Sequence, residues 1–547
     1  MESQRLILFF VFSFSLFLLV DAWQRDRQPQ LASAPTVTSE PKKDATIPPP
    51  PSEKLGVAPP TGSQAPVSGV AAGPAIKVET DLYRAEVSTM GGDLRRLELK
   101  QHWDTEDSKQ PFVLFDTRPD HLYVAQSGLL GDLPNHRTQF TAQAPDYKLT
   151  GGSNVIEVRL EAPPKNGVNV TKVYRFHRGS YLIDVAFEIA NHGPAPVQPY
   201  GYFQLLRHGN DPAGSSAMLP TFTGVGVYTD KEKFQKLAFG DIEKGKVPKT
   251  SEDGWIGMLQ HYFLGAWLPR NGTPREFYAR KIESLYAAGV IVPAPAVQPG
   301  SVAKLEVPLY AGPQEQDKLS KLAPGLDLSV DYGWLTIIAV PLFWVLSWLY
   351  QWVGNWGLAI ILLTVIIKLI FYPLSEASYR SMARMKIVAP KLQRLKEQYG
   401  DDKQRMQQAM MELYKTEKIN PLGGCLPIVV QIPVFIALYW VLLASVELRH
   451  APFILWIDDL SRIDPYFVLP ILMGATMIVQ TRLQPEPPDP VQAKVMKIMP
   501  IAFSVFFFFF PAGLVLYWLV NNVLSIAQQW HINRVLERAN LAPARKS

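Results

Sequence analysis

Lys368 is the residue whose surroundings are most suggestive of chemistry. It lies inside the apolar run from Leu358 to Tyr372, where a cation near the centre of a membrane helix costs about 2.5 to 3.5 kcal/mol. Thr364 lies one turn earlier on the same helical face, so the polar stripe is expected to face protein or water. Alternatively, the ammonium extends to the membrane surface, because Lys368 lies only five residues before Pro373.

Other apolar runs carry polar residues at helical spacing. They are Gln431 in one run, Thr476 and Gln480 four residues apart in another, and Tyr517, Asn521, Ser525 and Gln528 along one face of the last run. A single residue of this kind usually makes an interhelical hydrogen bond. Together, with a lysine and no acidic residue in any run, they predict a hydrophilic groove rather than a proton relay.

Histidine and cysteine usage gives no support for catalysis or for a metal centre. The chain has one cysteine, Cys425, no HExxH motif, and nine histidines, of which only His531 borders an apolar run. We therefore predict no catalytic residue, no metal site, no cofactor and no enzymatic activity. The net charge of +5 over 547 residues gives no indication of sequence-specific nucleic-acid binding.

The first part of the chain predicts an anchor and a tether. Residues 1–23 contain an uncharged apolar run behind Arg5, which predicts a retained signal anchor and first transmembrane helix. A cleaved signal peptide is the alternative. Residues 24–74 are rich in Pro, Ala, Ser and Thr and predict a disordered linker.

Residues 75–325 predict a large antiparallel β-sandwich. Apolar and polar residues alternate over 155–160, 172–176 and 181–189, and Gly, Pro and Asn separate these segments. About 250 residues is within the usual range for one β domain.

The last part of the chain predicts a membrane core over residues 355–547. Its expected spans are Trp356 to Tyr372, Pro427 to Ser445, Tyr466 to Thr481, Met499 to Pro511 and Gly513 to Trp530. With the anchor they make six spans of a polytopic α-helical membrane protein. Residues 326–354 hold another apolar run, Trp334 to Tyr350, which is predicted to lie as an amphipathic helix in the outer interface.

Loop charge predicts the topology. Residues 375–421 carry ten basic against six acidic residues, so this segment is expected in the cytoplasm. The loop from Val446 to Pro465 is expected outside, and both termini inside. The cytoplasmic segment has helical spacing with a break at residues 400–402 and predicts a helical hairpin. Lys391, Arg394 and Lys396 are its candidate docking residues, although a solvated connector is an equal alternative.

Several motifs then resemble one family. They are Gly354-Asn-Trp-Gly357, Tyr372-Pro-Leu374, Asn420-Pro-Leu-Gly-Gly-Cys-Leu-Pro427, Gln431-Ile-Pro433, Asp464-Pro465, Leu469-Pro-Ile-Leu-Met-Gly474, Gly513-Leu-Val-Leu-Tyr517 and Asp253-Gly-Trp-Ile-Gly-Met-Leu-Gln-His-Tyr-Phe263. In these motifs the chain resembles the YidC/Oxa/Alb family of membrane insertases in its Gram-negative form.

The resemblance implies a five-helix insertase core in the cell inner membrane. Its groove would open to cytoplasm and lipid and close to the periplasm, and a β-supersandwich would lie in the periplasm. It further implies nascent membrane proteins as clients and, as partners, the Sec translocon (SecYEG and SecDF), the ribosome and the signal recognition particle receptor. Lys368 would attract acidic or polar client segments. Gram-negative members commonly have arginine there, so lysine keeps the charge but loses the planar fork of donors.

Two other functions compete with insertion. A secondary transporter would show internal repeats and paired ionisable groups, and the sequence has neither. A periplasmic ligand-binding membrane protein would use the β domain, for which fold analogy is the only argument.

Overall fold

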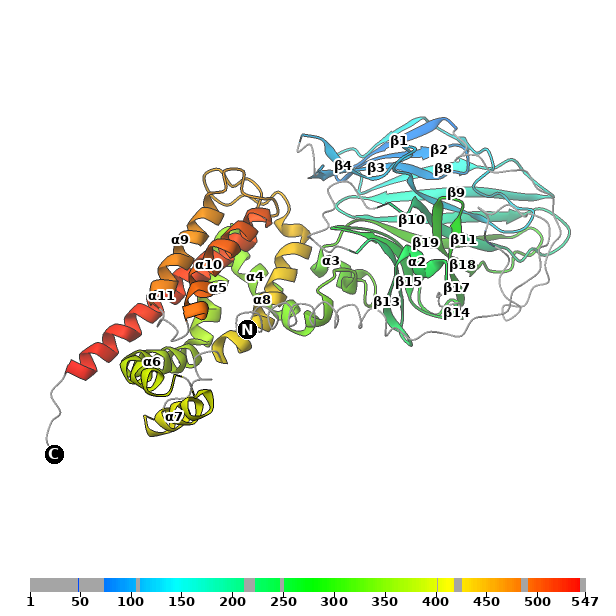
Figure 1. The fold of residues 1–547 in the computed structure, drawn as a ribbon. Coiled ribbons are helices and arrows are strands. Elements are labelled where there is room, and N and C mark those ends of the chain that lie inside the picture. The colour runs from blue at the N-terminus through cyan, green and yellow to red at the C-terminus, as the bar shows by residue number, and fades with distance from the viewer. Residues whose placement is uncertain are drawn as a thin grey trace. The chain divides into compact units, whose positions relative to one another are not determined.

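The computed structural model describes residues 48, 73–104, 109–210, 222–245, 250–400, 402–417, 426–483 and 490–541 (Figure 1). Its contacts divide the chain into two compact units, the β unit Leu31–Asp331 and the helical unit Met1–Gln30 with Tyr332–Ser547. The predicted anchor, 1–23, lies outside the described residues, as does nearly all of the predicted linker, 24–74.

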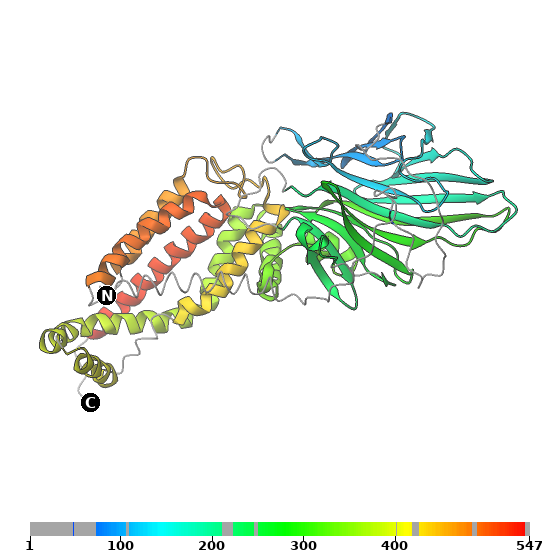
Figure 2. The same ribbon diagram turned by 45° about the vertical axis from the view of Figure 1, so that its right-hand side comes forward.

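The β unit consists of two sheets (Figures 1 and 2). The first has the order β14 (Thr250–Ser251), β17 (Arg275–Ile282), β18 (Leu285–Pro293), β11 (Tyr200–His208), β5 (Tyr123–Leu129), β3 (Leu94–Trp103), β2 (Tyr83–Ser88), β1 (Ala75–Glu79) and β7 (Asp146–Lys148), with β4 (Pro111–Phe115) paired to β3. The second has the order β13 (Lys233–Leu237), β12 (Gly224–Thr229), β15 (Trp255–Gln260), β16 (Phe263–Trp267), β19 (Val302–Pro313), β10 (Leu182–Asn191), β9 (Val168–His177), β8 (Val155–Glu161) and β6 (Thr141–Ala142).

Alternating burial explains why these segments form a sandwich. In β8 the side chains of Ile156, Val158 and Leu160 enter the core between the sheets, and the residues between them face outward. The three segments predicted from alternation correspond to β8, β9 and β10, which pair antiparallel in that order. The β1 and β7 pair is parallel. The antiparallel β-sandwich prediction is therefore confirmed in its main features.

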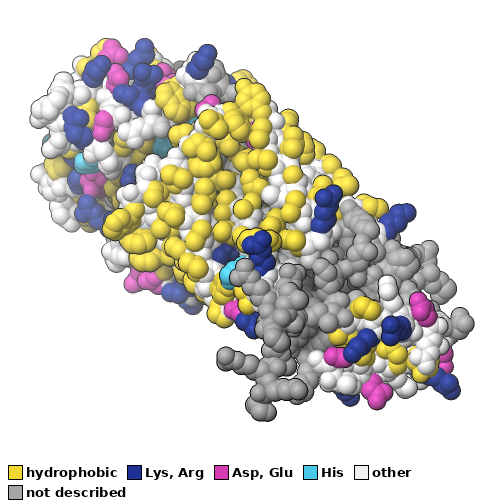
Figure 3. Space-filling model, turned by 90° about the vertical axis from the view of Figure 1, so that its left-hand side faces the viewer, with side chains coloured by type: hydrophobic (Ala, Val, Ile, Leu, Met, Phe, Trp, Pro, Cys, Tyr) yellow, Lys and Arg dark blue, Asp and Glu magenta, His cyan; other side chains and the backbone are white. Residues whose placement is uncertain are grey.

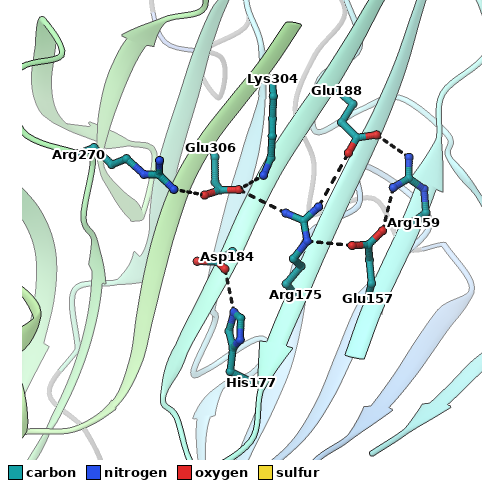
Figure 4. A network of polar contacts seen from close by, with 9 residues as sticks. All are labelled: Glu157, Arg159, Arg175, His177, Asp184, Glu188, Arg270, Lys304 and Glu306. Carbon is teal, nitrogen blue, oxygen red and sulfur yellow. Dashed lines mark hydrogen bonds and ion pairs between the residues drawn. The ribbon is translucent and has the colours of Figure 1, made fainter. Parts of the chain in front are cut away.

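The outward face of the second sheet carries a network of ion pairs (Figure 4). Arg175 on β9 contacts Glu157 on β8 at 2.8 Å and Glu306 on β19 at 3.3 Å. Glu188 on β10 pairs with Arg159, so the network joins four strands. The network comprises Glu157, Arg159, Arg175, His177, Asp184, Glu188, Arg270, Lys304 and Glu306. Such partly exposed cross-strand pairs contribute about 0 to 1 kcal/mol each. We read the network as a feature of the sheet face rather than as a ligand site.

A second polar cluster lies entirely inside the β unit. Asp93 and Lys172 are both fully buried, with 4.0 Å between Lys172 Nζ and Asp93 Oδ1. Lys172 Nζ donates hydrogen bonds to the carbonyls of Gly91 and Ser127, and Gln126 donates to Asp93. Burial raises the pKa of Asp93 to about 6, and Lys172 and Gln126 counteract that rise.

This cluster predicts a pH dependence of stability. Folded Asp93 keeps its proton up to about pH 6, whereas an unfolded aspartate loses it near pH 4. Relative to Asp93→Asn, the wild-type free energy of unfolding should therefore decrease by about 2 to 3 kcal/mol as pH rises from about 4 to 6. Denaturant titration of a fragment covering residues 31–331 measures this. A flat difference between the two proteins would contradict it, and the exposed Asp120→Asn serves as the control.

The helical unit contains the predicted membrane segments. Its helices are α4 (Thr336–Val353), α5 (Trp356–Ile370), α6 (Tyr372–Tyr399), α7 (Lys403–Thr416), α8 (Leu426–Ala444), α9 (Val468–Leu483), α10 (Pro490–Phe506) and α11 (Ala512–Leu541). Short 3₁₀ turns lie at η3 (Gly333–Leu335), η5 (Val446–Leu448) and η6 (Phe507–Phe509), and the β unit adds η2 (Asp327–Ser329), α2 (Phe239–Ile242) and α3 (Gln316–Leu322). α5 packs against α4 and α11, and α9 packs against α10 and α11.

Each of the five predicted core spans coincides with a helix, but few of these helices are long. Among the described residues, only Gly333–Val353 has both the length and the apolar composition to cross a bilayer by itself. α5 and the start of α6 qualify as a pair bent by 63°. The apolar parts of α8, α9 and α10 are shorter. The count of six spans thus stays a prediction, as does the interfacial position of α4.

The segment predicted as a hairpin contains two helices, α6 and α7, which contact each other. The break falls at residues 400–402, and Asp402 caps α7 by accepting hydrogen bonds from the backbone N–H groups of Gln404 and Arg405. The apolar side chains of Val388 and Leu392 on α6 are buried. The side chains of Met382 and Met385 lie outside the described part of the chain.

Candidate functional site

Lys368 lies half-buried on α5 and contacts α11. Its Nζ donates a hydrogen bond of 2.7 Å to Ser525 Oγ, and Ser525 Oγ donates in turn to the carbonyl of Asn521 at 2.7 Å. Ser525 and Asn521 are both buried. Two of the predicted groove helices therefore meet at the lysine.

The contacts continue from α11 to α8. Gln431 Nε2 donates to Asn521 Oδ1 across 3.4 Å, and both side chains are buried. Lys368, Ser525, Asn521 and Gln431 thus form a connected set, here named the polar chain, which links α5, α11 and α8. The structure brings together four of the polar residues that the sequence places in the apolar runs, and Ser525 joins Lys368 to Asn521.

The polar chain brings no negative charge to Lys368. Within the described ranges, its ammonium forms no ion pair with a carboxylate, and its hydrogen-bond partner is a neutral hydroxyl. The bond to Ser525 already has a charged donor, but a carboxylate would add the attraction between opposite charges. An incoming carboxylate could therefore displace Ser525 as the partner of Lys368.

The predicted site residues on α9 and at the start of α11 make no hydrogen bond to the polar chain in the described part of the molecule. The Thr476 hydroxyl donates to the carbonyl of Met473 and accepts from Asn522 Nδ2 at 3.3 Å. Gln480 lies half-buried one turn further along α9. Tyr517 is fully buried on α11, with its ring against Phe435, and its hydroxyl has no hydrogen-bond partner in the described part of the molecule.

Thr364 does not extend the polar chain. It is buried on α5, and its hydroxyl donates to the carbonyl of Ile360 at 2.7 Å. The sequence predicted a polar stripe through Thr364 and Lys368, but the hydroxyl is satisfied within its own helix. Asn522 is the residue that sequence reasoning missed. Its signal was the doublet Asn521-Asn522 inside an apolar run.

The three candidate docking residues of the hairpin differ in their surroundings. Lys391 Nζ forms an ion pair of 2.6 Å with Glu417, so it joins α6 to the end of α7. Arg394 is exposed. The side chain of Lys396 lies outside the described residues. A docking role is therefore easier to test at Arg394 than at Lys391.

No group of three or more His, Cys, Asp or Glu side chains in the described ranges is arranged to bind a metal ion. The arrangement around Lys368 offers a cation and hydrogen-bonding groups between helices. It can attract or orient a polar segment.

Comparison with known proteins identifies the family. The family model of the YidC periplasmic domain matches residues 75–345, and that of the 60Kd inner membrane protein matches residues 348–539. A membrane protein insertase YidC of Nitrosospira multiformis is 55% identical over the full length of both chains. The chain belongs to the YidC family of membrane protein insertases. A second YidC insertase, from Methylobacillus flagellatus, is 56% identical over 98% of each chain.

Membership of the YidC family gives the chain its function and compartment. It is an insertase of membrane proteins in the inner membrane, with a β-rich periplasmic domain and a C-terminal helical region. Among solved structures, an active YidC insertase matches 84% of this chain and 93% of its own at 19% identity, with a TM-score of 0.39.

Substitution of Lys368 tests the site directly. We expect Lys368→Arg to retain insertion and Lys368→Glu to reduce insertion of clients with acidic translocated tails by about tenfold or more. Reversing the charge turns an attraction of about 2 kcal/mol, for charges roughly 8 Å apart, into a repulsion. Lys368→Ala should have a milder effect that depends on the client. Insertion assays with paired acidic and neutral tails measure this.

Thiol labelling supplies an independent control for Lys368. With Cys425 replaced, a cysteine at position 368 should react with a membrane-impermeant reagent from the cytoplasmic side. If that cysteine is unreactive, and all substitutions act equally on every client, Lys368 only extends its ammonium to the membrane surface.

Proposed function

We propose that this insertase receives polar client segments at the polar chain of α5, α8 and α11. The observation that carries the proposal is the half-buried ammonium of Lys368, whose hydrogen-bond partner is the Ser525 hydroxyl. A cation among apolar helices attracts a carboxylate strongly, because little water screens it. Thr364, Thr476, Gln480 and Tyr517 are proposed as further groove residues beside this chain.

The hydrophobic surface of the helical unit supports a second step, in which the client helix moves into the lipid. Figure 3 shows a broad band of hydrophobic side chains across one face of the molecule. Exposed apolar residues of the helical unit include Ile471, Leu472, Ile478 and Val479 on α9 and Ile498, Ile501 and Val505 on α10. A client helix can leave such a surface for lipid, and burial of its apolar side chains supplies the free energy without a cofactor.

The proposed topology has six spans with both termini in the cytoplasm. The N-terminal anchor crosses first, and α5, α8, α9, α10 and α11 form the five-helix core. The basic hairpin of α6 and α7 then faces the cytoplasm, in agreement with the positive-inside rule. α4 lies in the outer interface, where the exposed Trp344, Trp348 and Trp352 suit the headgroup region.

The proposed partners are those that bring clients to the membrane. Nascent membrane proteins are the clients, the ribosome and the signal recognition particle receptor dock at the hairpin and C-terminal tail, and the Sec translocon shares some clients. An open hollow on α7, lined by Gln408, Met411, Glu412 and Lys415, adds polar and charged side chains and one methionine to this surface.

Removing the β domain tests whether the helical unit suffices for insertion. We expect deletion of residues 75–310 to leave client insertion within roughly twofold of wild type, because the polar chain is formed entirely by α5, α8 and α11 of the helical unit. Leu319 and Leu326 lose their burial in this deletion, so polar replacements at both positions form a matched second variant. Integration of a small client by residues 326–547 in liposomes is the second measurement. Complete loss of insertion, with the core folded and abundant, would refute the expectation.

Charge changes on the hairpin test docking. Ribosome association should weaken as salt rises above about 0.1 M, where charges more than about 10 Å apart are screened. Arg394→Glu should weaken it further, as should reversal of Lys396. Lys391→Glu also breaks the contact with Glu417, so its control is the exchange Lys391→Glu with Glu417→Lys. Salt-independent association would count against docking by charge.

A further inference from the structure

The loop of residues 446–465 is attached to the first turns of three helices. It is folded in itself, since Leu460 N–H donates to the carbonyl of Ala451 at 3.0 Å and His450 Nδ1 lies 3.2 Å from Asp459 Oδ2. Leu448, Ile457 and Leu460 are buried. This loop therefore has its own small core and a defined shape.

Asn355 attaches the loop to α5. Its Oδ1 caps the helix by accepting a hydrogen bond from Leu358 N–H at 3.0 Å. Its Nδ2 donates outward to the loop carbonyl of Phe453 at 3.0 Å, and Pro452 O lies 3.5 Å away. One side chain thus both begins the helix and joins it to the loop.

Gly357, two residues after Asn355, allows a second contact between α5 and Phe453. A Cβ atom at Gly357 would overlap the ring of Phe453, so the loop ring packs directly against the helix backbone. Among the twenty residue types, glycine alone leaves that room. In the motif Gly354-Asn-Trp-Gly357, Asn355 and Gly357 therefore attach the loop to the start of α5.

The loop also holds the starts of α9 and α11. Asp464 is buried, and its Oδ2 accepts from Leu469 N–H in the first turn of α9 at 2.8 Å, while its Oδ1 accepts from Trp456 Nε1 at 3.0 Å. At α11, Ala512 N–H donates to Arg462 O at 2.7 Å and Gly513 N–H donates to Leu460 O at 2.9 Å.

We propose that the loop of residues 446–465 fixes α5 against α11, and that Asn355 is the positioning residue that sets Lys368 opposite Ser525. Lys368 lies thirteen residues beyond Asn355, about 20 Å along the helix. A helix transmits a shift at its first turn over that distance almost undiminished, because its axial rise is fixed by backbone hydrogen bonds. The inference rests on the groove proposed for Lys368, since positioning matters only if Lys368 acts there.

Cross-linking in the full-length protein measures the position of α5 directly. A Cβ at Gly513 would lie 3.6 Å from Ile360 Cδ1, so cysteines at positions 360 and 513, with Cys425 replaced, should join through a short bifunctional thiol reagent. Asn355→Ser keeps the helix cap but removes the amide that reaches the loop, whereas Asn355→Ala removes both. Both variants should lower the cross-linking rate by about tenfold, the factor that one ordinary hydrogen bond allows.

A second pair of variants separates positioning from general damage. Gly357→Ala should lower cross-linking because the methyl group displaces Phe453, and Phe453→Ala in the same chain should restore it. The exposed Leu455→Ala should leave it unchanged. Insertion by Asn355→Ser, at normal abundance, should lose acidic-tailed clients preferentially, as Lys368→Ala does.

Each outcome of these experiments either supports the positioning role of Asn355 or overturns it. Unchanged cross-linking in Asn355→Ser, or a loss confined to Asn355→Ala, reduces Asn355 to a helix cap and overturns the proposal. Reduced cross-linking with no preference among clients also overturns it, provided that Lys368→Ala shows the preference. If Lys368→Ala shows none, the proposed groove fails, and the cross-linking of Asn355→Ser alone decides whether the loop positions α5.

Discussion

A lysine ammonium among apolar helices is the constraint around which the helical unit is built. Its charge needs a partner, and α11 supplies one as the hydroxyl of Ser525 rather than as a carboxylate. The choice of a neutral partner leaves the net charge of the site positive. It also requires α5 and α11 to keep a close register, because a hydrogen bond of 2.7 Å tolerates little displacement.

The buried lysine of the β unit, Lys172, has a different set of partners. Lys172 donates to two backbone carbonyls and faces Asp93, so every part of its setting belongs to the protein itself. Breaking a buried pair of this kind is strongly destabilising, since one charge would be left alone. Lys172 therefore stabilises the fold of the β unit, whereas Lys368 has a neutral partner that a client carboxylate is proposed to replace.

Local patterns were sufficient to predict the elements. Alternation located β8, β9 and β10, apolar runs located the helices of the membrane core, and the turn at residues 400–402 located the hairpin break. Contacts between distant segments were not predictable in this way. Neither the pair Lys391 and Glu417 nor the reach of Asn355 to Phe453 follows from any spacing. Thr364 shows a second limit of sequence patterns. Helical spacing predicted that Thr364 shares a helical face with Lys368, but it could not show that the Thr364 hydroxyl donates to a carbonyl of its own helix.

The consecutive asparagines of α11 have one further consequence. Asn521 contacts Gln431 of α8, and Asn522 contacts Thr476 of α9. Adjacent residues of a helix point about 100° apart, so one rigid turn of backbone serves two neighbours at once. Turning α11 to improve one contact worsens the other. The orientation of α11 therefore couples α8 to α9. Substitutions in α8 and α9 should change the free energy of unfolding non-additively, although these two helices need not contact each other.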